Sequence, residues 1–474
     1  MKEFGENAAY RDEDLPRLEM YGGPWAALIP TLVFILVLVW LSVYERASIS
    51  GFLVGGWLAL AIGMLLAKNR RQFSDSVIRG LSDKTGVVVI AAFIFAGVFG
   101  ALLSNSGLVD GLLWVGLELG VTGAAFVSLA FVLTCIFATG VGTSVGTYLA
   151  VLPILYPAGV ALGADPTILA VAILAGGSFG DNLAPISDST ISSAYTAQAE
   201  MGDVVRTRLP LTLVSALGSL IVFALFGGGG EITHTPDESS VGPLGLIMLI
   251  PFIVVVGLAM AKRHIITALI WGSIIGLIIG LITGLMSPTE LFSLPAERGG
   301  STGIIEDGIT GVYAPVVFVL FILAVAQLLK ESGLMGLILS SLEKRAAKDV
   351  KGTELSIFGI TLLFTVPLGA NAPAILLVGP TIGRPLGVRQ NLAPARIANL
   401  MDCAANTIFY VLPWHNAVIV WYSTLLIISD RHDIFAPSIG SAFLNPYAWI
   451  LILVMLFSIF TGWNRKYAAP VSSV

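Results

Sequence analysis

Two aspartates lie in one short polar stretch, "GDNLAPISDST" at residues 180–190, directly after the apolar run "ILAVAILAGGSF". Asp181 and Asp188 are accompanied there by the amide of Asn182 and the hydroxyl of Ser187. Carboxylate, amide and hydroxyl oxygens are the donors that hard cations prefer. A carboxylate at the centre of a bilayer costs about 2.5–3.5 kcal/mol on insertion scales, so its retention there indicates a function. The stretch therefore predicts a site for a small cation or a proton, provided that it lies within a membrane.

A second polar stretch, "TGVGTSVGT" at residues 139–147, interrupts another apolar run with three glycines. Glycine inside a helix costs about 1 kcal/mol relative to alanine, and backbone groups freed in lipid must be satisfied internally or by a ligand. We therefore expect a broken helix whose Thr143, Ser144 and nearby carbonyls face the ion. Further along, "VPLGANAPA" at residues 366–374 contains two prolines that are expected to break a helix, and it supplies the amide of Asn371.

A third polar stretch, "NLMDCAANTIFYVLPWHN", covers residues 399–416. Asp402 and Asn406 lie four residues apart, which places them on one face of a helix. His415 and Asn416 close the stretch. These four residues are the second candidates for the cation and proton site.

Each of these residues also has a structural interpretation. Asp188 could cap the helix that follows it, because aspartate is a favoured N-cap residue. Asp181 could lie in a turn at the membrane surface, and His415, next to a tryptophan, could be an interfacial residue. Asp402 could bond a neighbouring helix, and the small residues at 139–147 could simply allow close helix packing. The functional interpretation is favoured because polar positions recur in both halves of the chain.

The composition defines the environment of these stretches. The chain has 474 residues, of which 56% are hydrophobic and only 12% are charged, against about 25% charged in soluble domains. Apolar runs recur from end to end, and about a dozen of them approach the roughly 20 residues that cross a bilayer. We therefore expect an all-α polytopic membrane protein without a soluble enzymatic domain. No cofactor, disulfide or catalytic nucleophile is expected, since Cys135 and Cys403 lie far apart in apolar surroundings.

The chain also resembles itself. Three sets of matching positions are separated by offsets that drift from 226 to 228 residues: "LLSNSGL" at 102–108 with "LLKESGL" at 328–334; Gly142, Ser144 and Pro153 with Gly369, Asn371 and Pro380; and Pro185 with Pro413. The last offset pairs Ser187 and Asp188 with His415 and Asn416. We therefore predict two transmembrane repeats, 24–227 and 243–463. A polar tail at 1–23, an extracytoplasmic linker at 228–242 and a cytoplasmic tail at 464–474 complete the chain.

Loop charges predict the orientation of the repeats. Residues 68–84 carry five basic side chains against two acidic ones, whereas the matching residues 286–312 carry one basic side chain against four acidic ones. Basic loops stay cytoplasmic, so the repeats are expected to be inverted, with broken or re-entrant segments meeting at the midplane. The same rule predicts a solvated cytoplasmic face that contains Glu200, Asp203, Arg206 and Arg208.

The sequence "GGSFGDNLAPISDSTISSA", followed by "GDVVRTRLP", resembles the NhaC family of sodium/proton antiporters in the wider ion transporter superfamily. The resemblance implies two inverted halves, proton- or sodium-coupled exchange, and a functional motif of Asp181, Asn182, Ser187 and Asp188. The chain departs from the family where Asn182 replaces a frequent lysine. Because the family includes exchangers of organic acids and a tetracycline exporter, the resemblance supports antiport more strongly than it supports sodium.

We therefore expect a secondary antiporter of the cytoplasmic membrane that exchanges sodium, with lithium as a second candidate cation, for protons. Sodium is assigned to Asp181, Asp188, Ser144 and Asn371, and the partners are the two ions and the bilayer, with no nucleic acid. A homodimer is an expectation without a diagnostic motif. The alternative is a proton- or sodium-coupled carrier of a small carboxylate or drug, which would use His415 and the arginines 384 and 396, because carboxylates require cationic donors.

Overall fold

The structure is a computed structural model, and it describes residues 17–43, 49–82, 84–185, 187–230, 243–261, 263–294, 301–334, 336–337 and 349–468. Within these ranges the chain is helical and contains only isolated β-bridges in place of strands. The all-α fold is therefore confirmed. Most of the predicted N-terminal tail and linker, and the end of the C-terminal tail, lie outside the described residues, as does most of the basic stretch 341–351.

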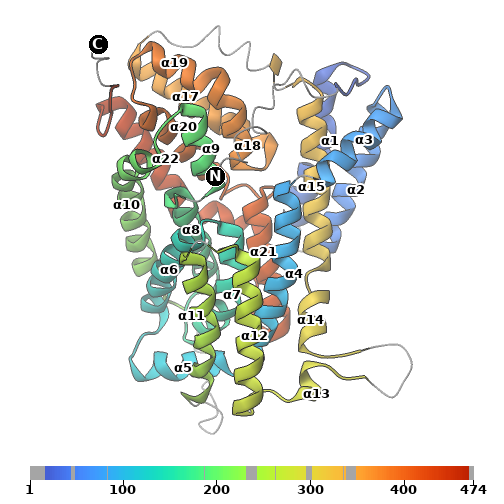
Figure 1. The fold of residues 1–474 in the computed structure, drawn as a ribbon, viewed down its shortest axis with the longest axis vertical. Coiled ribbons are helices and arrows are strands. Elements are labelled where there is room, and N and C mark those ends of the chain that lie inside the picture. Colours follow the sequence, from blue (N-terminus) through green and yellow to red (C-terminus); the bar gives the residue numbers. More distant parts are fainter. Residues whose placement is uncertain are drawn as a thin grey trace.

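The helices of the first predicted repeat are α1 (Leu28–Val43), α2 (Ile49–Leu66), α3 (Arg70–Leu81), α4 (Lys84–Ser104), α5 (Leu108–Glu118), α6 (Gly123–Val141), α7 (Ser144–Ala161), α8 (Pro166–Leu183), α9 (Asp188–Ala197) and α10 (Met201–Phe226). The main helices of the second are α11 (Leu249–Met260), α12 (Ile265–Thr283), α13 (Pro288–Leu291), α14 (Ile304–Thr310), α15 (Tyr313–Glu331), α17 (Val350–Leu368), α18 (Asn371–Val378), α19 (Arg384–Arg389), α20 (Pro394–Ile408), α21 (Asn416–His432) and α22 (Pro446–Thr461). Figure 1 shows how they are arranged.

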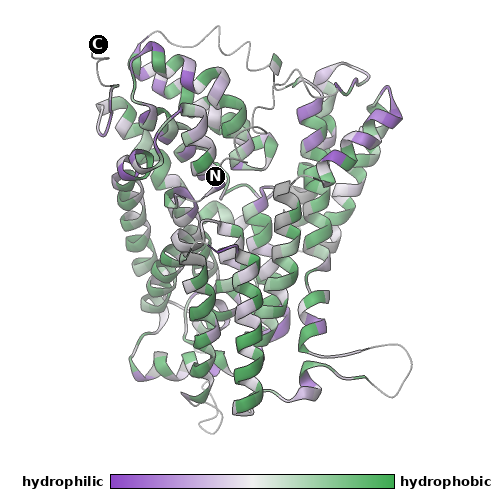
Figure 2. Cartoon of the chain, viewed as in Figure 1, coloured by the Kyte–Doolittle hydropathy of each residue, from purple (hydrophilic) through white to green (hydrophobic). Residues whose placement is uncertain are grey.

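Apolar helices form most of the molecule. Seven helices in the described part of the chain are long and apolar enough to cross a membrane, and shorter apolar helices accompany them. Figure 2 shows hydrophobic residues along the length of α11 and α12, whereas hydrophilic residues gather on α3 and α19, toward one end. The protein is therefore a polytopic membrane protein. The helix α3, with Arg70, Arg71 and Arg79, packs against α15 at that end.

The helix break expected within residues 139–147 is present, and a second break has the same backbone geometry. Helix α6 ends at Gly142, which adopts a left-handed conformation with φ 73° and ψ 18°. Helix α17 ends likewise at Gly369, with φ 61° and ψ 11°. Glycine adopts this conformation without the steric penalty of a Cβ atom. After each glycine, one extended residue precedes the next helix, so Ser144 and Asn371 become the first residues of α7 and α18.

The break expected within residues 366–374 is present, but it does not fall at either proline. Pro367 lies within α17, and Pro373 lies in the first turn of α18. Proline is tolerated in a first turn because the amide hydrogen that it lacks would have no helical partner there. The break falls instead at Gly369, at the offset of 227 from Gly142.

The two loops that carry opposite charge lie at opposite ends of the molecule. In Figure 1, α3 from the basic loop lies at the top, and α13 from the matching acidic loop lies at the bottom. This arrangement is the one that inverted repeats require. The inversion itself stays a prediction.

Candidate functional site

The end of α8 and the starts of α7, α9 and α18 meet around one carboxylate. Asp181 lies in the last turn of α8 and is 7% exposed. Asparagine, serine and tyrosine side chains from both predicted repeats surround it. The helix breaks are what bring them there, because they place Ser144 and Asn371 at helix starts rather than inside continuous helices.

Every hydrogen bond recorded for the Asp181 carboxylate comes from a neutral donor. Ser187 Oγ donates to Oδ1 at 2.6 Å, and Asn371 Nδ2 donates to Oδ2 at 3.2 Å. The Tyr410 hydroxyl also donates to Oδ2 and lies 3.0 Å from Ser144 Oγ. Because a phenol carries a single proton, Ser144 is the donor in its bond to Tyr410. Five side chains, four from helices or their caps and Tyr410 from the turn after α20, thus form one continuous network.

Two asparagines extend this network to a second buried carboxylate. Asn371 Nδ2 donates to Asn406 Oδ1 at 2.9 Å, and Asn406 Nδ2 donates to Asp402 Oδ1 at 2.6 Å. Asn406 also donates to Ser189 Oγ at 3.0 Å, which in turn lies 3.1 Å from Ser187 Oγ. Asp402 and Asn406 therefore share one face of α20, as their spacing predicts, and join the same cluster as Asp181.

Asp402 differs from Asp181 in having an arginine partner. Arg208 of α10 forms an ion pair with Asp402 Oδ2, and both side chains are fully buried. The same guanidinium donates to Thr190 Oγ1 at 2.8 Å and to Asn399 Oδ1 at 2.9 Å. The backbone carbonyl of Asn182 also accepts a hydrogen bond from it. Arg208 thus joins α8, α9, α10 and α20.

The helix termini favour negative charge at Asp181. Ser144 and Asn371 begin α7 and α18, and Ser187 is the N-cap residue of α9. Helix N-termini carry partial positive charge, which stabilises a nearby anion. Ser187 uses its hydroxyl for Asp181 rather than for a capping hydrogen bond to its own helix. The site therefore surrounds a buried carboxylate with neutral donors and three helix N-termini, without a cationic side chain among its recorded partners.

Five of the predicted residues have side chains apart from this network, and three of these five belong to α7, α8 and α9 or their caps. Asp188 is exposed and occupies the first position of α9, where its charge complements the helix N-terminus. Asn182 is fully buried, but its side chain bonds Tyr447 Oη at 3.0 Å and Cys403 Sγ at 3.9 Å. Thr143 is the N-cap residue of α7, and its carbonyl accepts a hydrogen bond from the Thr147 hydroxyl.

His415 and Asn416 contact the break between α17 and α18. His415 Nε2 lies 3.2 Å from the carbonyl of Val366, and the backbone nitrogen of Asn416 donates to the carbonyl of Gly369 at 3.1 Å. Both residues are therefore placed at the end of α17 rather than at Asp181. Their positions at the start of α21 match those of Ser187 and Asp188 at the start of α9.

The structure corrects the expected solvated face at residues 200–208. Glu200, Asp203 and Arg206 are exposed, and Arg206 pairs with Asp203 at 3.3 Å. Arg208 is instead fully buried, because its side chain projects from α10 toward α20 and meets Asp402. Tyr410 is the second functional candidate that the sequence did not reveal. Its position corresponds to Asn182 at the offset of 228, so the repeat contained a signal for it.

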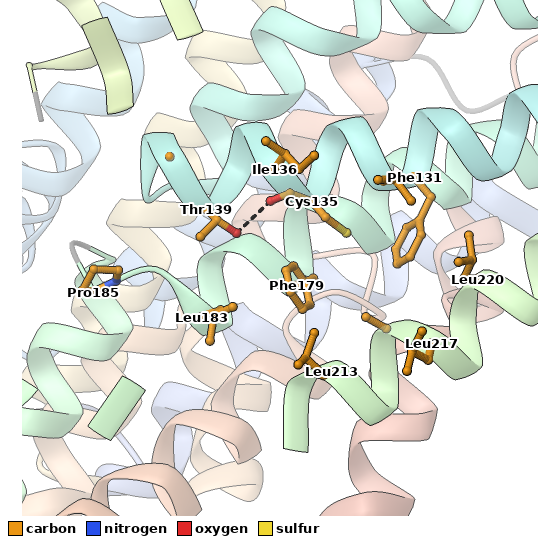
Figure 3. A pocket seen from close by; sticks show the side chains of 13 residues that line it. Phe131, Cys135, Ile136, Thr139, Phe179, Leu183, Pro185, Leu213, Leu217 and Leu220 are labelled. Atoms are coloured by element: carbon orange, nitrogen blue, oxygen red, sulfur yellow. Dashed lines mark hydrogen bonds between the residues drawn. The ribbon is translucent and has the colours of Figure 1, made fainter. Parts of the chain in front are cut away.

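A large apolar groove lies on the other side of α8. It has a volume of about 620 Å³ and is lined by residues of α6, α8 and α10 together with Pro185 (Figure 3). Phe179 and Leu183 line it, one helical turn apart, so Asp181 between them projects to the opposite side of α8. The Thr139 hydroxyl in its wall is bonded to the carbonyl of Cys135 at 2.7 Å. The groove is therefore separate from the polar cluster.

A helical membrane protein with buried carboxylates and amides at two helix breaks has the architecture of a secondary transporter. A sequence profile of the Na+/H+ antiporter family matches residues 18–228 and 240–460. The chain belongs to this family, and it is a transporter rather than an enzyme.

Characterised relatives differ in what they exchange. The malate-2H(+)/Na(+)-lactate antiporter of Bacillus subtilis is 23% identical, over 92% of this chain and 93% of the relative. The Na(+)/H(+) antiporter NhaC of Alkalihalophilus pseudofirmus is 25% identical, over 83% of this chain and 87% of the relative. The arginine/ornithine antiporter ArcD of Halobacterium salinarum is 25% identical, over 84% of each chain. All three are antiporters, and the similarity therefore supports antiport without specifying the substrate.

Proposed function

We propose that this protein exchanges sodium, with lithium as a second candidate cation, for protons across the cytoplasmic membrane. One observation carries the proposal: Asp181 is a buried carboxylate whose recorded hydrogen bonds all come from neutral donors. A carboxylate in that setting gains most from a positive ion, and either a proton or a small cation supplies it.

Competition for one carboxylate is sufficient for exchange. The charged, empty site is disfavoured inside the membrane because of the cost of desolvating a carboxylate. The site would therefore switch its access from one side of the membrane to the other only while Asp181 is neutralised, either by a proton or by sodium. When the cation binds on one side, the proton is displaced, and the reverse occurs on the other side. The proton gradient then drives cation export.

The neighbours of Asp181 supply the remaining oxygen ligands in this proposal. Ser187 brings a hydroxyl oxygen directly to the carboxylate, and Ser144 brings one next to it through Tyr410. Asn371 presents its amide nitrogen to Asp181, while its amide oxygen accepts from the Ala372 backbone nitrogen, so this oxygen becomes a ligand only when the amide turns toward the cation. Hard cations prefer such oxygens. Asn406 lies within hydrogen-bond distance of Asn371, and Asp188 stays a predicted ligand whose contribution a variant can measure.

Everted membrane vesicles test the exchange directly. A fluorescent probe of internal acidity should report proton efflux when sodium chloride is added, and Asp181→Asn should abolish this response. Asp203→Asn is the matched control, because Asp203 is an exposed acid on the same protein. Loss of the response in both variants, or its persistence in Asp181→Asn, would contradict the assignment.

Exchange of organic acids or amino acids is the second candidate function, because two of the relatives are named for it. Arg396, one of the arginines expected to bind a carboxylate, is buried and bonded to Glu354 at 2.7 Å. Arg208 is likewise engaged by Asp402. Vesicles that show no proton efflux when sodium chloride is added, but accumulate a labelled carboxylate or a basic amino acid, would favour this candidate.

We also propose that residues 24–227 and 243–463 are inverted repeats. The equal geometry at Gly142 and Gly369, and the opposite ends occupied by α3 and α13, support the proposal. Single cysteines introduced at Arg71 and Glu290 would be labelled by an impermeant reagent from opposite sides of the membrane. Labelling of both from the same side would contradict the inversion.

A further inference from the structure

Arg208 is held on every side by acceptors. Besides the ion pair with Asp402, its guanidinium bonds Thr190 Oγ1, Asn399 Oδ1 and the carbonyl of Asn182, and Nη2 lies 3.5 Å from Ser193 Oγ. The side chain is 0% exposed. An arginine is always protonated in proteins, and five acceptors in a rigid arrangement fix it in one position. It is therefore a permanent positive charge inside the cluster.

Both oxygens of Asp402 are occupied. Oδ2 accepts from Arg208 and from Thr190 Oγ1 at 3.3 Å, and Oδ1 accepts from Asn406 at 2.6 Å. A transported cation would have to displace the guanidinium or the amide to reach this carboxylate. Removing one member of a buried ion pair leaves an uncompensated charge at high cost.

Asp181 has no comparable compensation among the partners that the structure records. Its donors are two hydroxyls and one amide, all neutral. Across the described cluster of the two buried aspartates and Arg208, two negative charges and one positive charge leave a net charge of −1. Asn371 and Asn406 connect the two carboxylates through hydrogen bonds. A change of charge at one carboxylate therefore alters the electrostatic energy of the other.

We infer that Arg208 sets the net charge of the buried cluster. It neutralises Asp402 permanently and leaves Asp181 as the one buried carboxylate of this cluster that is available to the transported ion. The inference rests on the proposed cation–proton exchange and deepens it. Asp402 acts as the counter-ion of Arg208 rather than as a ligand. The site therefore accepts one monovalent cation in place of one proton, and a full cycle moves no net charge.

The number of charges that the site exchanges can be tested in the native protein by its balance point, which is the pair of sodium and proton gradients at which net exchange stops. The purified protein in liposomes would be given opposing sodium and proton gradients, while potassium and valinomycin set the membrane potential. Net proton flux should be zero when the ratio of sodium concentrations across the membrane equals the ratio of proton concentrations. A change of membrane potential should not shift this condition. A balance point that moves with the potential overturns the inference but leaves the proposed function intact. Absence of any sodium-dependent flux defeats both.

Charge-pair variants test the residues themselves. Asp402→Asn leaves Arg208 unpaired beside the site and should raise the KM for sodium at least about tenfold, because an uncompensated positive charge repels the cation. The double variant Arg208→Gln/Asp402→Asn removes both charges and should bring that KM back to within about threefold of the native value. The balance point of the double variant should also be independent of the membrane potential.

The outcomes separate a counter-ion from a ligand. If Asp402 is a ligand, the double variant stays as defective as Asp402→Asn although it is folded, which contradicts the inference. Gel filtration and thermal unfolding of each variant establish folding. If the double variant does not fold, the balance point of the native protein still decides the charge count.

Discussion

Two buried carboxylates in this protein have opposite surroundings. Glu354, at the start of α17, accepts from Arg396 Nε at 2.7 Å and from Arg465 Nη2 at 2.7 Å. Asp181, at the end of α8, accepts only from hydroxyls and an amide among its recorded partners. Both side chains are almost inaccessible. The difference indicates which acid is able to bind a transported ion. Glu354 is paired with two arginines and has a structural role, whereas Asp181 has no charged partner among those recorded and is available to a mobile cation.

The largest expected effect is on exchange in Asp181→Asn. An amide cannot carry the negative charge for which the cation and the proton compete, so sodium-dependent proton flux should fall at least about 100-fold, which corresponds to about 2.7 kcal/mol of lost interaction. Flux in everted vesicles measures it, and expression and gel filtration show that the variant is folded. Retention of more than a tenth of native flux would contradict the distinction between the two acids.

Glu354→Gln should affect stability rather than exchange. It leaves Arg396 and Arg465 without their shared carboxylate, and breaking a buried ion pair costs about 3–5 kcal/mol. Thermal unfolding in detergent should shift to lower temperature. Flux per folded molecule should stay within about twofold of the native value, since the hydrogen bonds recorded for the Glu354 carboxylate come from Arg396 and Arg465 and not from the cluster. A specific loss of flux at native stability would show that the network of Glu354 participates in transport.

Tyr410→Phe should have an intermediate effect on sodium affinity. The variant removes a hydroxyl that donates to Asp181 and contacts Ser144. A hydrogen bond to a charged group contributes about 1.5–3 kcal/mol, so the KM for sodium should rise about tenfold or more. The control is Tyr156→Phe, whose hydroxyl bonds the carbonyl of Phe435. Equal effects of the two changes would exclude a specific role for Tyr410.

Asp188→Asn should have the smallest effect. The carboxylate is exposed at the first position of α9, and removing a charge near a helix N-terminus changes stability by about 0.3–1 kcal/mol. We expect the KM for sodium to change less than about threefold. A loss as severe as that of Asp181→Asn would instead support the prediction from the sequence that Asp188 is a sodium ligand.

Much of the fold was predictable because lipid imposes a simple rule on sequence. Apolar runs of sufficient length become helices, and the glycine-rich interruption at residues 139–147 became a break. The second break was assigned to prolines, but it falls at the left-handed Gly369 between them. Pro373 lies in the first turn of α18, where proline is tolerated, and Pro367 lies within the last turn of α17.

The acidic residues of the site could be predicted from the sequence, but the ion pair between Arg208 and Asp402 could not. Asp181, Ser187, Asn371, Asp402 and Asn406 were identified because polar groups are costly in lipid, and the structure brings them together. Charge balance depends on tertiary packing, so the sequence placed Arg208 on a solvated face.

A signal for Arg208 nonetheless existed. Thr212, Ser215 and Ser219 follow it four, seven and eleven residues later and are all buried. This spacing places Arg208 on the packed face of α10.

The central claim is that Asp181 alone exchanges a proton for the transported cation. The most direct measurement is proton release from the purified, detergent-solubilised protein in weakly buffered solution when sodium chloride is added, with choline chloride as the control salt. In a solution acidic enough to protonate Asp181 before the salt is added, close to one proton should be released per chain. Asp181→Asn should release none, and the Arg208→Gln/Asp402→Asn double variant should still release it. Release that persists in Asp181→Asn, or none from the native protein, would contradict it.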